Sequence, residues 1–135
     1  MATLSAFLHP VSADQEKEVI ISTRFQDEQG NPVPFVIRAL SQEENEKLLA
    51  RCTKKGKNGQ PDTLDNIAYS RQLICAAVKV PDFSDAELCR SYGVVDPSLV
   101  PGKMLLVGEH ARLVREIQDF CGFSEPEDIG AQAKN

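Results

Sequence analysis

Residues 17–40 read KEVIISTRFQDEQGNPVPFVIRAL, and this stretch decides the fold. Polar and apolar residues alternate over 17–25, as in a strand with one buried face. That face carries Val19, Ile21, Thr23 and Phe25. The alternation resumes over 33–40, and the sequence DEQGNP at 27–32 has the Gly, Asn and Pro of a turn. The stretch therefore predicts a β-hairpin. Because two strands alone are only marginally stable, its apolar face must pack on helices or join the sheet of another chain.

The sequence after the hairpin predicts two helices. SQEE at 41–44 is a capping box, in which the Ser and the last Glu each hydrogen-bond to the other's backbone. This helix is expected to end near residue 53, before the Gly- and Pro-containing stretch 54–61. A second helix is predicted over 63–79, where Pro81 prevents it from continuing. Its last two turns are apolar nearly all round, so we expect it to be the central helix of the core.

Shorter helices are predicted next. FSDAEL at 83–88 combines a capping box that starts at Ser84 with an apolar staple, and Gly93 is placed to end this helix. Asp-Pro at 96–97 is typical of another helix start, and Pro-Gly at 101–102 is expected to interrupt the chain soon afterwards.

A last amphipathic helix is predicted from Glu109 to a stop at Gly122. Its apolar face carries Leu113, Val114, Ile117, Phe120 and Cys121. On the other face Arg112 with Glu116, and Arg115 with Asp119, are spaced four residues apart, which favours ion pairs within the helix.

These elements predict an α+β, helix-dominated fold, in which an N-terminal β-hairpin packs on about four to five helices in a single domain. The domain is expected to span 17–123, with the hairpin at 17–40 and a helical part at 41–123. Residues 1–16 are interpreted as an N-terminal arm with a short helical turn at 4–8. Residues 124–135 are interpreted as a mobile acidic tail, because they have little apolar content.

The charge of the chain disfavours some partners. Twenty acids against 15 bases give a net charge of −5, which argues against nucleic acid and anionic membranes as partners. Residues 1–60 hold 8 acids and 8 bases, whereas 61–135 hold 12 acids and 7 bases, so the second half carries the whole surplus. This asymmetry fits either two faces for different partners or an ordinary solvated surface.

The location and redox state follow from two further patterns. The N-terminus has no basic segment followed by an apolar one, and the longest apolar run, 73–78, is far shorter than the ~20 residues of a membrane span. We therefore expect an intracellular protein with reduced cysteines. Cys52, Cys75, Cys89 and Cys121 are widely spaced without nearby His, so no metal site is predicted, and Cys75 and Cys121 are expected in the core.

No motif for catalysis or cofactor binding is recognisable, so we expect no enzyme, no catalytic residue and no cofactor. His110 begins a charged helix face, where a solvated side chain is the simpler interpretation. GKNG at 56–59 matches the GxxG loop with which KH domains clamp nucleic acid, and lysines stand beside it. Eight glycines make a chance match common, so a lysine-rich loop explains it as well.

The order of these segments resembles one family. The resemblance is carried by LSAFL at 4–8, the two hairpin strands, QEENE at 42–46, DAEL with SYG at 85–93, and GKMLL with GE at 102–109. On these residues the chain resembles the XkdN-like tail assembly chaperones of phages and prophages of Gram-positive bacteria. The resemblance spans roughly residues 4–123.

The resemblance implies a non-catalytic protein that coats the tape measure protein, keeps it soluble, and delivers it to tail tube subunits. It also implies activity in the cytoplasm of the bacterial host, absence from the mature virion, and in many phages a longer product made by frameshifting near the gene's end. Two alternatives remain, namely a small structural tail or head-completion subunit retained in the virion, and a nucleic-acid-binding regulator. Whether the chain forms a homo-oligomer stays open.

Two segments could contact a client. The hairpin offers a strand edge for β-augmentation. The compact apolar run Met104, Leu105, Leu106 and Val107 could bind a client helix, and the alternative for this run is packing in the core.

Overall fold

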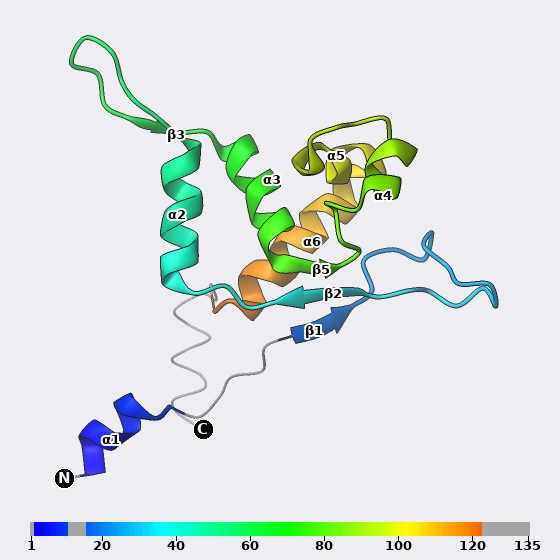
Figure 1. Ribbon diagram of the computed structural model, residues 1–135, viewed down its shortest axis with the longest axis horizontal. Helices are drawn as coiled ribbons and strands as arrows, with labels where there is room; N and C mark the ends of the chain where they lie inside the picture. Colours follow the sequence, from blue (N-terminus) through cyan, green and yellow to red (C-terminus); the bar gives the residue numbers. More distant parts are fainter. Residues whose placement is uncertain (1, 11–15, 123–135) are drawn as a thin grey trace.

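A three-stranded antiparallel sheet forms one layer of the molecule, and helices cover one of its faces (Figure 1). The computed structural model describes residues 2–10 and 16–122. The strand order is β1 (Glu16–Val19), β2 (Phe35–Arg38) and β5 (Val78–Val80). The α-helices are α1 (Ala2–Leu8), α2 (Gln42–Cys52), α3 (Asn66–Ala77), α4 (Ala86–Ser91), α5 (Val100–Met104) and α6 (Val107–Phe120). A short 3₁₀ helix, η1 (Pro97–Leu99), precedes α5.

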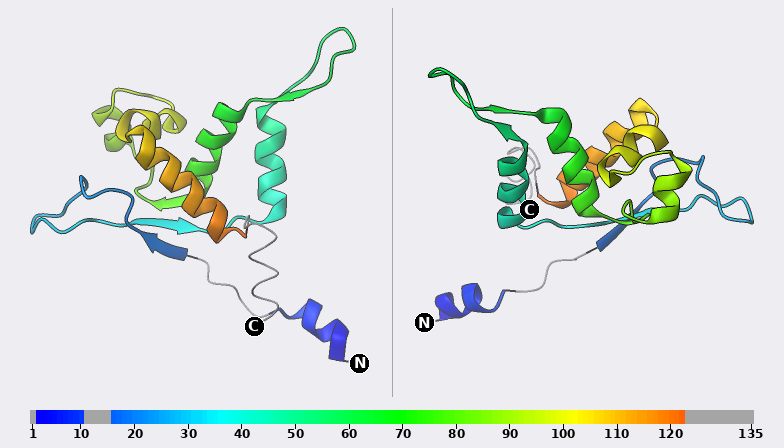
Figure 2. Two further views of the ribbon diagram at one scale, coloured as in Figure 1. Left: turned by 180° about the vertical axis from the view of Figure 1, so that it is seen from behind. Right: turned by 45° about the horizontal axis from the view of Figure 1, so that its top comes forward.

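This architecture confirms the predicted α+β, helix-dominated single domain, with five α-helices after the hairpin. The expected helical turn at 4–8 is part of α1. Between α2 and α3 the chain forms a two-stranded ribbon of β3 (Thr53–Lys54) and β4 (Thr63–Leu64), which projects away from the helices (Figure 2). The predicted mobile tail at 124–135 lies outside the described residues.

The hairpin forms as predicted but is shorter. Glu16 pairs with Arg38 and Val19 with Phe35, and residues 20–34 leave the sheet as a long connection. Its tip is the predicted turn, because the Asp27 carboxylate accepts hydrogen bonds from the backbone N–H groups of Gln29 and Asn31, both at 2.9 Å.

Contacts with α6 begin inside β1 and continue along residues 20–24, which lie beyond the strand. Lys17 pairs with Glu116 at 3.4 Å, Arg112 donates to the Ile21 carbonyl at 2.6 Å, and Arg24 donates to Glu109 at 3.0 Å. The α6 partners lie at positions 116, 112 and 109, so they share one helix face, and the two segments run antiparallel. The predicted pairs inside α6, Arg112 with Glu116 and Arg115 with Asp119, are wrong for the described residues, because longer-range partners take Arg112 and Glu116.

The predicted helix over 63–79 is too long at both ends. It begins at Asn66, because the Asp65 side chain accepts from the Ala68 N–H at 3.0 Å and caps the first turn. It ends at Ala77, and the following residues pair with β2 as strand β5. Two β-branched valines favour the strand, and Pro81 excludes a longer helix. Strand β2 therefore has partners on both sides, so the sheet edges available for augmentation belong to β1 and β5.

The structure confirms one of the two predicted capping boxes and corrects the other. The capping box of Ser41 and Glu44 is confirmed, and the Arg38 guanidinium lowers the pKa of Glu44 to about 2. In α4 the prediction is wrong: Asp85 is the cap, and Ser84 donates to Asp82 instead.

Two boundaries near α5 also differ from the prediction. Pro101 and Gly102 lie inside α5 rather than ending it, because Pro is tolerated in a first helical turn. The last helix starts at Val107, two residues before the predicted Glu109.

The core lies between the sheet and helices α3 and α6. Its largest fully buried side chains are Ile21, Ile37, Leu73, Ile74, Val100, Pro101, Leu113 and Ile117. The predicted apolar face of the last helix and the predicted central helix are both confirmed by this set.

The contact between Arg112 and the Ile21 carbonyl predicts a stability effect. Arg112→Met removes the donor from a carbonyl of a fully buried residue, so we expect a loss of about 1–3 kcal/mol in the free energy of unfolding. Arg115→Met is the control, because Arg115 is exposed on the same helix and is expected to change stability by less than about 0.5 kcal/mol. Urea denaturation measures both variants. Equal effects would show that the Ile21 contact contributes nothing.

The contact between Arg24 and Glu109 predicts a pH dependence. Hydrogen bonds from Arg24 lower the pKa of Glu109 from its ordinary 4.5 to about 2, so the folded chain holds this carboxylate charged where the unfolded chain would protonate it. The stabilisation is present above pH 4.5 and is lost as the pH falls towards 2. Glu109→Gln should therefore be less stable than wild type at pH about 7, with the difference shrinking near pH about 3. Urea denaturation at both pH values tests this, and a difference independent of pH would contradict it.

Candidate partner-binding surface

The structure divides the predicted binding run into two halves. Met104 and Leu105 are 8% and 9% exposed and belong to the core, whereas Leu106 and Val107 are 61% and 91% exposed. The division lies where α5 ends and α6 begins, because the extended backbone of Leu105 and Leu106 turns the chain between the two helices. We call the exposed pair Leu106 and Val107 the apolar step.

The apolar step is held by the long-range contact of Arg24. The Arg24 guanidinium donates to the Met104 carbonyl at 3.1 Å and to both oxygens of Glu109. The Glu109 carboxylate also accepts from the Leu106 N–H at 2.8 Å. Leu106 itself is at the N-cap position of α6 and has no side-chain acceptor. The carboxylate therefore fixes the backbone at the apolar step, and its neighbouring guanidinium ties that backbone to the hairpin.

Met104 also borders a fully apolar pocket of about 130 Å³ at the end of the sheet. The remaining lining residues are Phe25, Val33, Pro34, Phe35, Val80 and Pro81. The rings of Phe25 and Phe35 lie 5.7 Å apart, as in a tilted aromatic pair. This pocket is not predictable from local sequence patterns, because it joins three segments that are distant along the chain.

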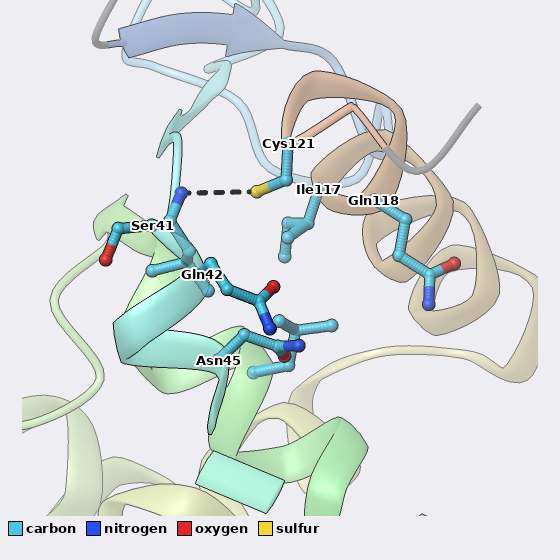
Figure 3. A pocket seen from close by; sticks show the side chains of 8 residues that line it. Ser41, Gln42, Asn45, Ile117, Gln118 and Cys121 are labelled. Atoms are coloured by element: carbon cyan, nitrogen blue, oxygen red, sulfur yellow. Dashed lines mark hydrogen bonds between the residues drawn. The ribbon is translucent and has the colours of Figure 1, made fainter. Parts of the chain in front are cut away.

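A second pocket, of about 150 Å³, lies between the start of α2 and the end of α6 (Figure 3). Its lining is mixed: Leu40, Leu73, Ile117 and Cys121 are apolar, and Ser41, Gln42, Asn45 and Gln118 are polar. The Cys121 thiol accepts a hydrogen bond from the Leu40 N–H at 3.3 Å, so this cysteine holds the α2 start against α6.

The environment of the cysteines indicates a role in packing rather than in chemistry. All four are free thiols, and Cys75 and Cys121 pack against the core as predicted. Burial raises the pKa of Cys75 to about 11 and also raises that of Cys52, so these thiols stay protonated and poorly nucleophilic at neutral pH. No group of three or more His, Cys, Asp or Glu side chains in the described part of the chain could hold a metal ion.

The GxxG sequence at 56–59 lies in the loop that joins β3 to β4. Its glycines have structural reasons: Gly59 has a φ of +80°, and a Cβ on Gly56 would lie 1.9 Å from the Gln60 carbonyl oxygen. Lys54 pairs with Asp65 at 3.5 Å.

Among the described helices, none is long and apolar enough to cross a membrane.

Comparisons with known proteins identify the family. The sequence matches the family model described as phage XkdN-like tail assembly chaperone protein over residues 4–134. It is 33% identical to the protein YqbN and 31% identical to the phage-like element PBSX protein XkdN, both of Bacillus subtilis strain 168. Each alignment spans 127 residues and covers 90% of this chain and 85% of the relative.

The fold agrees with a solved relative. The crystal structure of YqbN superposes with a TM-score of 0.71 at 27% identity, over 88% of this chain and 96% of that one. Sequence, order of elements and fold therefore lead to one conclusion: the chain belongs to the family of XkdN-like phage tail assembly chaperones.

Proposed function

We propose that this protein binds the tape measure protein of its phage in the host cytoplasm and keeps it soluble until tail tube subunits assemble around it. The proposal gives the protein no catalytic step and no place in the mature virion. Its main support is membership of the tail assembly chaperone family. The described residues supply a surface with suitable chemistry.

The observation that carries the binding surface is the apolar step. Two neighbouring large apolar side chains are exposed at a helix start whose backbone is held by Arg24 and Glu109. An amphipathic client helix could lay its apolar face on such a surface. Because the backbone is already fixed, little conformational entropy would be lost on binding.

One apolar step is small, so each copy would contribute only modest affinity. A tape measure protein is long and could engage many copies, and repeated weak contacts along one molecule give a high overall avidity. The net charge of −5 on every bound copy would keep the loaded complex soluble through mutual repulsion.

The double variant Leu106→Ser, Val107→Glu tests the surface without weakening the fold. Serine is a preferred N-cap and glutamate is favourable in the first turn of a helix, so α6 keeps its start. Burying one Val or Leu side chain contributes about 1.5–3 kcal/mol, so we expect at least about tenfold weaker binding. The measurement is co-expression with the tape measure protein, followed by pull-down and determination of its soluble fraction.

Val95→Glu is the matched control, because Val95 is 97% exposed but lies in the connection after α4. It should retain binding. A tape measure protein that stays equally soluble and unbound without this chain would refute the proposed function. Mass spectrometry of purified virions provides a separate check, since a copy retained in the particle would favour the structural-subunit alternative.

A further inference from the structure

A groove between α3 and α6 differs in chemistry from the rest of the surface. It has a volume of about 360 Å³ and is lined by Asn66, Ile67, Ser70 and Arg71 of α3, Gly102 of α5 and His110 of α6. None of these six residues is an acid, although the chain carries five more acids than bases. We call it the α3–α6 groove.

The polar side chains of the groove are available to a ligand. Within residues 2–10 and 16–122, no ion pair engages Arg71 or His110, and no hydrogen bond engages the side chain of Ser70. Asp96 is an acid close enough for the charge of Arg71 to act on it, but the two form no ion pair, and its Oδ1 accepts from the N–H and the hydroxyl of Ser98, both at 2.9 Å. The groove thus presents a guanidinium, an imidazole and a hydroxyl.

Exposed apolar side chains border these donors on both helices. Ile67 is 67% exposed and precedes Ser70 and Arg71 by three and four residues, so all three share one face of α3. Val107 of the apolar step precedes His110 by three residues and shares its face of α6. One face of α6 therefore carries both His110 of the groove and Val107 of the apolar step.

We infer that the α3–α6 groove binds an acidic side chain of the client, with Arg71 pairing with its carboxylate and with Ile67 and Val107 covering apolar residues beside it. The inference rests on the proposed function, because it names the chemistry of the client segment. Charge complementarity favours this occupant, since a guanidinium and a carboxylate form strong charge-assisted hydrogen bonds. A purely apolar client would instead leave the donors of the groove without partners.

The state of His110 follows from the same geometry. Burial and the charge of Arg71 lower the pKa of His110, so its imidazole is mostly neutral at neutral pH in the empty groove. A carboxylate bound beside both groups would offset the charge of Arg71 and raise that pKa. Binding should accordingly strengthen as the pH falls through the pKa of His110.

NMR can follow this site directly, because the chain has two histidines and His9 serves as an internal reference. The imidazole signals are recorded in a titration with propionate, and then with synthetic peptides that tile the tape measure protein. We expect propionate and the binding peptides to shift the signals of His110 and raise its pKa while leaving His9 unchanged. Exchange of the acidic residue of a binding peptide for its amide should weaken binding at least about tenfold.

Two variants address the groove from different sides. Arg71→Ala removes the cation and should weaken peptide binding at least about tenfold, whereas Arg115→Ala removes an exposed cation of α6 outside the groove and should not. Gly102→Leu adds bulk instead, because a Cβ at Gly102 meets no atom within 4 Å and leucine is favourable in a helix. It should block binding while circular dichroism and thermal unfolding remain close to wild type.

The outcomes separate the groove from the proposed function. If peptides bind wild type but neither the acid-to-amide exchange nor Arg71→Ala weakens them, the groove inference is overturned and the chaperone function stands. If no peptide and no full-length tape measure protein binds, the proposed function fails. The propionate titration then still decides whether the groove binds carboxylates, and unchanged His110 signals at rising propionate would overturn that as well.

Discussion

The rest of the structure depends on one long-range constraint, the antiparallel course of residues 17–24 along α6. Three polar contacts hold it, and they join residues that are 85, 91 and 99 positions apart in the chain. Their spacing along α6 follows the helix period, so they lie beside the buried face of Leu113 and Ile117 rather than interrupting it. The same segment supplies β1, whose residues Glu16–Val19 pair with one edge of β2 while β5 pairs with the other edge.

The same constraint shapes the exposed surface. Arg24, which makes the last of the three contacts, donates hydrogen bonds to the Met104 carbonyl and to the Glu109 carboxylate. That carboxylate also accepts a hydrogen bond from the Leu106 N–H. The chain between α5 and α6 thus has a fixed course, although it contains only two residues outside the helices. Two large apolar side chains, Leu106 and Val107, are exposed to water there. A rigid apolar step is a better docking surface than a flexible one, since less entropy is lost when a partner orders it.

Local signals in the sequence predicted the elements that depend on local interactions. The capping box at Ser41, the turn at 27–32 and the buried face of α6 each rest on residues within a few positions of one another, and all are confirmed. Strand β5 is not predictable in this way, because it pairs Val80 with Val36 and Val78 with Ile37, more than 40 residues away, and a strand of three residues shows no periodicity of its own. The candidate site shows the same limit. The run at 104–107 is apolar in sequence, but its division into core and surface depends on where α5 ends and α6 begins, and the α3–α6 groove depends on two helices meeting.

Most acids of the helical half have a local structural role. Six of the nine acids between residues 61 and 122, namely Asp62, Asp65, Asp82, Asp85, Asp96 and Glu109, accept hydrogen bonds from backbone N–H groups at turns and helix starts. These carboxylates fix the chain locally, so their positions have a structural reason that does not require a basic partner. They still carry negative charge, which would repel a client carboxylate brought close to them. The α3–α6 groove is the place that we propose for such a carboxylate, because no acid lines it and Arg71 makes no ion pair within residues 2–10 and 16–122. In a chain with this charge, the position of a single arginine therefore restricts where and in which register an acidic amphipathic client could lie.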